Sequence, residues 1–439
     1  MLCTSSRAPP ATTCAGIEKS GCRPRECEMF RGDWMDLAMT DRALIFTGLV
    51  RDERRFVEFL EKFRSLPSEE RPPVYFSTWV GELDKYPVAA SMLRELGVII
   101  FEQRQPDLLL PGHVLHQLIA LDIALACIDP NTFVFKSRPD FADFSTYQSF
   151  VTLKPSIVTE RCFADVSPRC RIHVMGCFVA HPFYINDITY CALAQDLSCV
   201  VSLPFLAMSR YHRVAPEQLI WGGNSIGRIR VLDRYFRVNT GLIFNDEEKA
   251  RAHSRILKDY VGYAYALAAY FLILNSYFSS IHPPIAGEFD FVGDATLDDL
   301  LWGRVDAPSV VFHATAYTNA FRKIGVVEKI LRGEFQRSDF GDRVLEAISI
   351  LTSSQRPQDY LTDEIEASAR TYCEAVKSVD VRGGKLMLRE GTRFRVEGAG
   401  PGWAQQQTGT LLTEKLENEV NYLRRVVNDL QERLRKALP

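Results

Sequence analysis

The sequence predicts an α/β fold with a mostly parallel sheet and helices on both of its faces. Strand-like and helix-like segments alternate from residue 41 onward, which is the order that parallel sheets require. Hydrophobic residues make up 46% of the 439 residues and charged residues 24%, an ordinary globular balance that excludes wholesale disorder. At ~150 residues per domain, the chain holds two or three domains, or one large domain with extensions.

The first predicted elements follow a regular strand–helix order. Apolar runs predict strands at 44–50, 74–80, 98–102 and 132–136. The helical spacing of apolar residues predicts helices at 56–66, 88–96 and 113–128, the first two ended by Pro67 and Gly97. Because parallel sheets bind ligands beyond the carboxyl ends of their strands, the residues of interest are 48–51, 77–79 and 137–143.

Beyond residue 150 the pattern becomes mixed. Strands are predicted at 156–159, 171–180, 235–244 and 309–313, and helices at 186–200, 216–221 and 247–280. The uncharged stretch 260–281 is long enough to cross ~30 Å of hydrocarbon. Its Tyr and Ser residues, Asn275 and the charged helical pattern before it favour a buried core helix instead. We therefore expect no transmembrane segment and a cytoplasmic protein.

Five regions are predicted along the chain. They are a disordered or non-native tail at 1–40, a main domain at 41–330, a small α-rich appendage at 331–396, a linker at 397–410 and a coiled-coil helix at 411–439. In the last region Leu recurs every seven residues, with Val or Leu between, a pattern that favours parallel dimers. We expect a homodimer through 416–437; the alternative is a helix packed back on the body.

Charge and cysteine usage exclude two classes of function. Lys and Arg total 52 against 55 Asp and Glu, a net charge of -3, which argues against a general nucleic-acid-binding protein. The eleven cysteines form no CxxC pair and no spacing typical of zinc ligands. Free, partly buried cysteines in a reducing cytoplasm are the expectation.

The sharpest functional motif is FVFKSRPDFADF, residues 133–144. A hydrophobic strand delivers Lys136, Arg138, Asp140 and Asp143 to the edge where a parallel sheet binds its ligands. Acidic residues there can hold Mg²⁺ or Mn²⁺ against a diphosphate, and Lys or Arg can neutralise phosphate charge. The alternative for such a motif is a surface salt-bridge cluster at a strand end.

Two weaker features lie near this motif. Gly48 and Arg51 end the first strand in a turn where the backbone can approach a base or ribose. His113, His116 and Gln117 lie on the first turns of the helix before the fourth strand. Two His at this spacing can bind metal, but without an adjacent Glu a solvated or buried pair is favoured.

The sequence resembles the WavE lipopolysaccharide-synthesis glycosyltransferases and related capsular-polysaccharide transferases. The resemblance depends on four segments in order, which span about half the chain. They are IFTGLVRDE (45–53), HQLIALDIAL (116–125) leading to FVFKSRPDF (133–141), HPFYINDITYCALAQDL (181–197) and PEQLIWG (216–222). The Lys-x-Arg-x-Asp pattern at 136–140 is the most specific of them. Pro139 departs from the family, where this position is usually small and polar.

The resemblance implies a GT-A-like, Rossmann-type nucleotide-sugar fold with an acidic metal-binding motif after the fourth strand. It implies that Asp140 binds the metal and diphosphate, that Lys136 and Arg138 contact the donor phosphates, that Gly48 and Arg51 border the nucleotide, and that Gln117 faces it. His313 could complete the metal site, although a core histidine is the favoured interpretation.

Two acidic residues are similar to acidic positions in the family's acceptor half, Asp187 and Glu217. An inverting transferase needs one carboxylate as general base on the acceptor hydroxyl, and we expect Glu217 first and Asp187 second. Glu217 follows Pro216 at a predicted helix start, where the helix dipole alone favours a Glu.

The resemblance and the motif together predict a divalent-metal-assisted glycosyltransferase. It would move a sugar from a nucleotide-sugar donor to a surface-polysaccharide or lipopolysaccharide acceptor, at the cytoplasmic side, with peripheral association at the inner membrane left open. Two alternatives stay open: a nucleotidyltransferase or phosphatase on a similar sheet, and a catalytically inert scaffold that dimerises through its C-terminal coiled coil.

Overall fold

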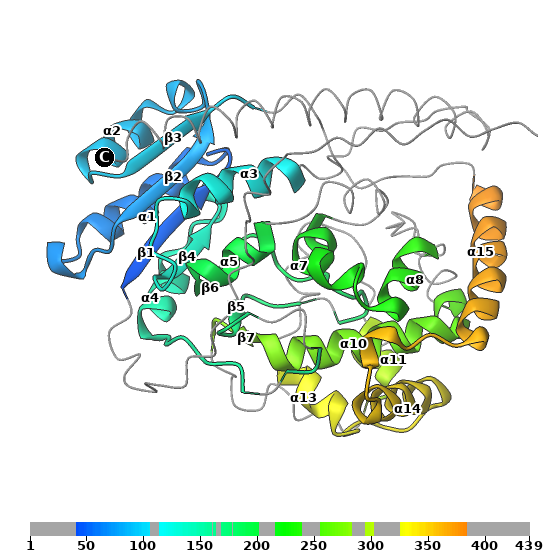
Figure 1. Cartoon of the computed structure of the whole chain (residues 1–439). Coiled ribbons are helices and arrows are strands. Elements are labelled where there is room, and N and C mark those ends of the chain that lie inside the picture. The colour runs from blue at the N-terminus through cyan, green and yellow to red at the C-terminus, as the bar shows by residue number, and fades with distance from the viewer. Residues whose placement is uncertain are drawn as a thin grey trace, which may run out of the picture. The chain divides into compact units, whose positions relative to one another are not determined.

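The computed structural model contains a seven-stranded, mostly parallel sheet (Figure 1). The structure describes residues 41–105, 114–159, 161–163, 168–177, 179–201, 216–238, 255–282, 295–302 and 325–383. Its strands are β1 (Arg42–Thr47), β2 (Val74–Trp79), β3 (Ile99–Gln103), β4 (Phe133–Ser137), β5 (Ile172–Val174), β6 (Tyr190–Leu193) and β7 (Phe278–Ser280).

The strands lie in the order β3-β2-β1-β4-β6-β5-β7. β1 pairs in parallel with both β2 and β4, and β2 pairs in parallel with β3. β6 runs antiparallel to its neighbours β4 and β5, and β7 runs parallel to β5. The predicted α/β class with a mostly parallel sheet is therefore confirmed, and this arrangement is compatible with a Rossmann-like fold.

Helices follow most strands. They are α1 (Glu53–Arg64), α2 (Pro87–Glu95), α3 (Val114–Leu125), α4 (Phe144–Thr152), α5 (Ala194–Val201), α7 (Pro216–Ile226), α8 (Arg230–Val238), α10 (Val261–Tyr277), α11 (Leu297–Trp302), α13 (Gly325–Leu331), α14 (Asp339–Ser353) and α15 (Asp363–Gly383). The helices in the first part of the chain cover the sheet, and α13, α14 and α15 pack against α10. The three helices predicted between residues 56 and 128 correspond to α1, α2 and α3, with bounds shifted by a few residues.

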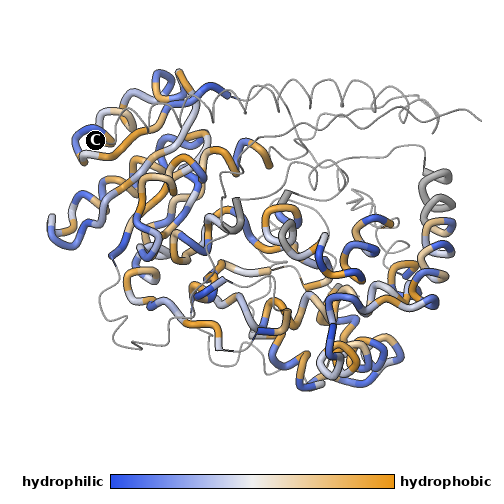
Figure 2. Tube along the Cα trace, viewed as in Figure 1, coloured by the Kyte–Doolittle hydropathy of each residue, from blue (hydrophilic) through white to orange (hydrophobic). Residues whose placement is uncertain are grey.

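The two faces of the sheet are buried in two separate hydrophobic clusters. Successive side chains of β1 alternate between them, because strand side chains point to opposite faces. Leu44 and Phe46 face α1, α2 and α4, where the ring centroid of Phe46 lies 5.1 Å from that of Phe56. Ala43 and Ile45 face the cluster that includes α3, α7, α8 and α10. The hydrophobic stretches of the strands and of α3 stand out in Figure 2.

α10 is a buried core helix, as the sequence analysis favoured. Most of its side chains are buried, and it packs against α8, α13, α14 and α15. The predicted helix over 247–280 is interrupted at Tyr260, and residues 247–254 lie outside the described ranges. Across the described ranges, no helix combines the length and apolar character needed to cross a membrane.

The helices beyond residue 330 share the core of the preceding part of the chain. Phe340 of α14 stacks on Tyr263 of α10, with ring centroids 5.6 Å apart, and Tyr372 of α15 stacks on Tyr260 at 5.0 Å. The predicted tail, linker and coiled coil lie outside the described residues, so the dimer through 416–437 stays a prediction.

The prediction of a strand at 235–244 is wrong for its first part, because residues 235–238 belong to α8. Val231, Leu232, Tyr235 and Phe236 recur at helical spacing and are all buried on one face, which is the signal of an amphipathic helix. The remaining residues, 239–244, lie outside the described ranges.

Other predicted elements are shorter in the structure or lie outside its described residues. In the segment predicted as a strand at 171–180, β5 is followed by an isolated bridge between Cys177 and Ile185, and 156–159 contributes one isolated bridge, between Ile157 and Cys170. The helix predicted at 186–200 begins at Ala194, because β6 occupies the buried residues before it. The strand predicted at 309–313, with His313, lies outside the described residues.

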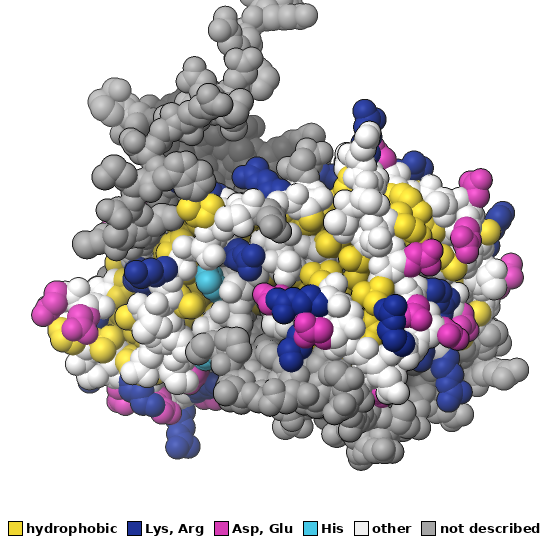
Figure 3. Space-filling view, turned by 90° about the horizontal axis from the view of Figure 1, so that it is seen from below, with side chains coloured by type: hydrophobic (Ala, Val, Ile, Leu, Met, Phe, Trp, Pro, Cys, Tyr) yellow, Lys and Arg dark blue, Asp and Glu magenta, His cyan; other side chains and the backbone are white. Residues whose placement is uncertain are grey.

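Basic and acidic side chains intermingle on the face seen in Figure 3, with hydrophobic side chains between them. Ion pairs of α13 and α14 have the same mixed character, among them Arg332 with Glu328 and Arg337 with Asp342. Exposed pairs of this kind contribute little to stability, ~0–1 kcal/mol each. This mixture of charges agrees with the near-neutral net charge of the chain.

One buried histidine makes folding sensitive to acid. His173 of β5 lies against Phe133, and neither ring nitrogen makes a well-formed hydrogen bond to a described residue, although backbone groups of Ser280 and Lys154 are near. Burial lowers its pKa from 6.5 to about 4. Between these two pH values the unfolded chain binds a proton that the folded protein does not, so the folded protein loses stability as the pH falls.

We expect the free energy of unfolding of the wild type to fall by up to ~3 kcal/mol, relative to that of His173→Leu, as the pH drops from 6.5 to 4. Groups that titrate in the same way in both proteins cancel when the two free energies of unfolding are subtracted. Denaturant unfolding at several pH values measures it, and a difference that does not change with pH contradicts the neutral buried histidine.

Candidate functional site

The loops after β1 and β2 are tied together at the carboxyl edge of the sheet. Gly48 follows β1 with a φ of 98°, a conformation that glycine adopts without steric cost. Its N–H donates to the Ser77 carbonyl at 3.0 Å, and its carbonyl accepts the Thr78 hydroxyl at 2.9 Å. Gly48, predicted to border the nucleotide, therefore has its own backbone groups bonded within the protein.

Arg51 lies at the centre of a tight three-residue turn. Its φ is 48°, and the Asp52 N–H donates to the Val50 carbonyl across it. Such a turn around a non-glycine residue is strained and persists only where neighbouring contacts hold it. Here Glu82, a buried carboxylate, accepts the Val50 N–H at 3.1 Å. The sequence motifs did not point to Glu82, which follows β2 in an ordinary polar loop.

Arg138 and Asp140 form a bidentate ion pair just after β4. Arg138 Nε donates to Asp140 Oδ1 at 3.0 Å and its terminal nitrogen to Oδ2 at 2.5 Å. Arg51 approaches the same Oδ2 to 3.6 Å, and the Arg138 guanidinium lies 4.9 Å from the ring centroid of Phe141. One carboxylate thus holds two guanidinium groups at the edge of the sheet.

Asp143 caps helix α4. Its Oδ2 accepts the Thr146 N–H at 2.9 Å, the Thr146 hydroxyl at 2.7 Å and the Ser145 hydroxyl at 2.5 Å. Burial raises the pKa of this carboxyl, but the hydrogen bonds from Ser145 and Thr146 outweigh it and hold the pKa below its usual value. These bonds satisfy the first turn of the helix and account for the residue.

The two predicted metal ligands are committed to other partners. Asp140 binds two guanidinium groups, and Asp143 binds the first turn of α4. No three His, Cys, Asp or Glu side chains cluster as metal ligands within the described ranges. Asp140 and Asp143, in this arrangement, do not fit a protein-held Mg²⁺ or Mn²⁺, because both oxygens of Asp140 accept from Arg138 and Asp143 serves as the cap of α4.

Lys136 is buried beneath this edge. Its register partners across β4 are Ile45 of β1 and Tyr190 of β6. Its ammonium group donates to the carbonyl of Asp187 at 2.7 Å and lies 4.7 Å from the ring centroid of Tyr190. Burial lowers its pKa to about 7, with Arg138 acting in the same direction and the charge of Asp187 opposing.

Asp187 and Glu217 are two buried carboxylates close enough to affect each other electrostatically. Burial raises the pKa of Asp187 to about 6, and the charge of Glu217 raises it further. The charges of Lys136 and Arg138 and a hydrogen bond from Gln117 act in the opposite direction. The structure therefore brings together five residues that sequence reasoning had selected on separate segments.

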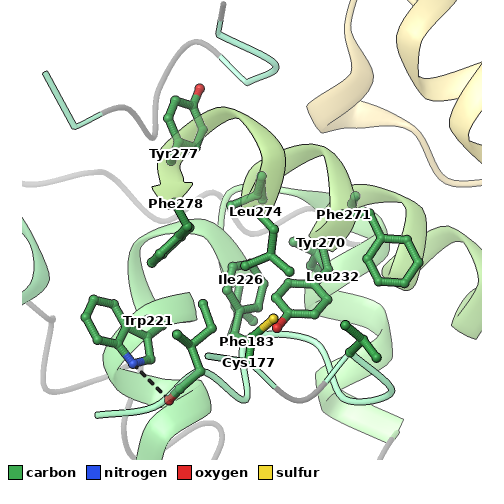
Figure 4. Packing of buried hydrophobic residues seen from close by; sticks show 14 of the residues in the cluster. Cys177, Phe183, Trp221, Ile226, Leu232, Tyr270, Phe271, Leu274, Tyr277 and Phe278 are labelled. Atoms are coloured by element: carbon green, nitrogen blue, oxygen red, sulfur yellow. Dashed lines mark hydrogen bonds between the residues drawn. The ribbon is translucent and has the colours of Figure 1, made fainter. Parts of the chain in front are cut away.

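Helix α7 brings Glu217 to this cluster by a close approach at Gly222. A β-carbon at Gly222 would lie 2.8 Å from the Phe183 ring, so only glycine allows the contact. Figure 4 shows Trp221 and Phe183 in this packing, and the Trp221 indole N–H donates to the Ile185 carbonyl at 3.1 Å. Gln218 donates to the Pro182 carbonyl at 2.8 Å. The helix is thus held directly against the loop that carries Asp187.

Two further predicted or neighbouring residues have structural contacts. His116 is buried, with its ring 5.3 Å from that of Trp79 and Nε2 3.2 Å from the Gln105 amide, so it is a packed core histidine. Its predicted partner His113 lies outside the described residues. Ser137 and Thr189 share a hydrogen bond of 2.8 Å next to Lys136, a pair that the motifs did not indicate.

Comparisons with known proteins give no independent assignment. No protein-family model matches the sequence, and no curated protein matches it. The proposal for function therefore depends on the residues and their geometry.

Gly222→Ala tests how α7 is positioned. The added methyl group collides with the buried Phe183 ring, and we expect a loss of ~1–3 kcal/mol in the free energy of unfolding. Gly227→Ala is the matched control, because a β-carbon there meets no atom within 4 Å. Denaturant unfolding compares the two, and equal stabilities would contradict the close approach.

Lys136→Met tests the buried ammonium group. With a folded pKa of about 7 and an ordinary pKa of 10.5, the unfolded chain binds the extra proton between these values. The stability of the wild type relative to the variant should then rise with pH, by at most about 1.4 kcal/mol per unit between pH 7.5 and 9.5. Unfolding curves across this range measure the difference, and a constant difference would show an unperturbed lysine.

Proposed function

We propose that the protein is a glycosyltransferase that moves a sugar from a nucleotide-sugar donor to a surface-polysaccharide or lipopolysaccharide acceptor on the cytoplasmic side. The observation that carries the proposal is the convergence of two charge clusters at one sheet edge. One is exposed Arg51 and half-buried Arg138 on Asp140; the other is buried Lys136, Asp187 and Glu217.

The arginine pair suits the donor. A nucleotide sugar presents a diphosphate, and guanidinium groups bind phosphate oxygens in a planar fork. When the bond from the sugar to the diphosphate breaks, negative charge accumulates on the leaving group, and fixed positive charge nearby stabilises it. The edge beyond β1 and β4 is where parallel sheets bind ligands, which supports placing the diphosphate there.

The carboxylate pair suits the acceptor. Transfer needs a base to remove the proton of the attacking hydroxyl, and a carboxylate whose pKa lies near the working pH is effective in this role. Asp187, with its pKa raised to about 6 by burial and by Glu217, meets this requirement. The two carboxylates act as a pair, and either one accepts the proton depending on which faces the acceptor.

The family resemblance adds the acceptor class and the GT-A-like type of fold to the proposal. A phosphatase or nucleotidyltransferase on the same sheet would release phosphate or pyrophosphate, whereas a transferase releases a nucleoside phosphate or diphosphate. An inert scaffold would bind no nucleotide. The products that the wild type releases therefore distinguish the transferase from the phosphatase or nucleotidyltransferase and from the inert scaffold.

Asp187→Asn and Glu217→Gln test the base. We expect at least one of them to lower kcat by roughly 100-fold or more, while the dissociation constant for the nucleoside diphosphate stays within about threefold. The measurement is release of UDP, GDP, CMP or ADP from the matching nucleotide sugars in the presence of glycan or glycolipid acceptors. The wild-type rate should fall below pH 6 as Asp187 takes up a proton.

Glu334→Gln is the control, an exposed glutamate paired with Arg332 far along the chain. Full activity in both active-site variants would contradict the base assignment. Release of phosphate or pyrophosphate by the wild type, or no nucleotide binding at all, would contradict the transferase itself.

A further inference from the structure

We propose that Arg51 and Arg138 bind the donor diphosphate without a divalent cation, and that Asp140 is a positioning residue for the two arginines rather than a metal ligand. This inference rests on the proposed function and deepens its donor site. It replaces the metal expected from the sequence motif with an arginine pair.

The state of Asp140 is the first support. Both of its oxygens accept from Arg138, at 3.0 and 2.5 Å, and Oδ2 also faces Arg51 at 3.6 Å. Bidentate pairs of this kind are the strongest side-chain ion pairs and have a fixed geometry. A divalent cation on Asp140 would have to displace Arg138 and would then lie beside two guanidinium charges.

The second predicted ligand offers no help to a cation. Asp143 is turned toward the N-terminus of α4, where one of its oxygens accepts from three donors of Ser145 and Thr146. If Asp143 turned to bind a cation, the N-terminus of α4 would lose its cap. The acidic pattern that predicts a metal in the sequence is thus accounted for by one positioning residue and one helix cap.

Neighbouring residues fix the positions of Arg51 and Arg138, which favours binding of an anion. Arg51 is 55% exposed, yet its backbone is held in a strained turn that Glu82 anchors through the Val50 N–H. Strain at an exposed residue is maintained when the position of its side chain matters. Arg138 is fixed by Asp140 on one side and by the Phe141 ring on the other.

The charge balance at this edge favours the same ligand. Two arginines and one aspartate leave one net positive charge, and each guanidinium has five N–H donors, more than Asp140 uses. α1 and α4 begin directly after the loops that carry Arg51 and Arg138. Their first turns are already capped by Asp52 and Asp143, so anion binding here depends on the arginines. A diphosphate, with several anionic oxygens spread over two phosphorus atoms, matches two arginines held together by one carboxylate.

The test measures binding of pyrophosphate and of UDP, GDP, CDP and ADP to the full chain by calorimetry, with excess EDTA and with Mg²⁺ or Mn²⁺. We expect one nucleoside diphosphate to bind equally well in both conditions and better than its monophosphate. Arg138→Gln should weaken binding about tenfold or more and reduce the preference for diphosphate over monophosphate, a change that a purely structural role would not cause. Arg51→Gln should act in the same direction.

Asp140→Asn gives the discriminating result. It keeps one hydrogen-bond acceptor for Arg138 and removes a negative charge, so binding in EDTA should stay within about threefold or become tighter. Arg64→Gln is the matched control, an exposed arginine at the far end of α1 paired with Glu95. If Arg138→Gln does not fold, Arg51→Gln and Arg138→Lys carry the test.

Binding that requires Mg²⁺ or Mn²⁺ and is lost in Asp140→Asn would overturn this inference while leaving the transferase proposal in place. Equal binding to wild type and both arginine variants would also overturn it. If neither pyrophosphate nor any nucleotide binds in either condition, the proposed function fails with it. Binding of pyrophosphate in EDTA that depends on the arginines supports the inference even where no sugar is transferred.

Discussion

The burial of the Lys136 ammonium group is the interaction on which the candidate site depends. A charged amine inside a protein costs several kcal/mol unless hydrogen bonds and opposite charges offset it. The Asp187 carbonyl, the Tyr190 ring and the Asp187 carboxylate supply that compensation. The loop after residue 185 therefore has to close over the end of β4, and its position determines where the acidic residues of the site lie.

The same loop is held from the other side by α7. Gly222 allows the helix to contact Phe183, and Trp221 contacts both Tyr190 and Phe278, with ring centroids 4.9 and 5.6 Å apart. Tyr190 in turn lies against Lys136. Packed aromatic rings thus connect the helix that carries Glu217 to Lys136, and this part of the candidate site is as rigid as the core beneath it.

Strands β1, β2 and β4 were predictable because their apolar runs are buried on both faces and bounded by charged turns, whereas β6 and β7 fell within segments predicted as helices. Residues 235–238 (YFRV) were predicted as part of a strand because their apolar side chains also suit a strand. Their helical spacing becomes visible only when Val231 and Leu232 are included. Sequence alone selected Asp187 and Glu217, but their meeting depends on a glycine contact between distant segments. Glu82 carried no signal, since its role depends on which backbone N–H it faces.

The two charge clusters are linked through Arg138. Its positive charge lowers the pKa of Lys136 and also that of Asp187. A diphosphate bound to Arg138 would offset that charge and thereby raise both pKa values, which makes the Asp187 carboxylate a stronger base once the donor is in place. The segment Lys136–Asp140 holds the groups that this coupling would require. Lys136 supplies the buried amine, Arg138 the guanidinium at the edge of the sheet, and Asp140 the carboxylate that fixes Arg138. Under the proposed function, donor binding and proton removal from the acceptor would therefore be coupled by electrostatics.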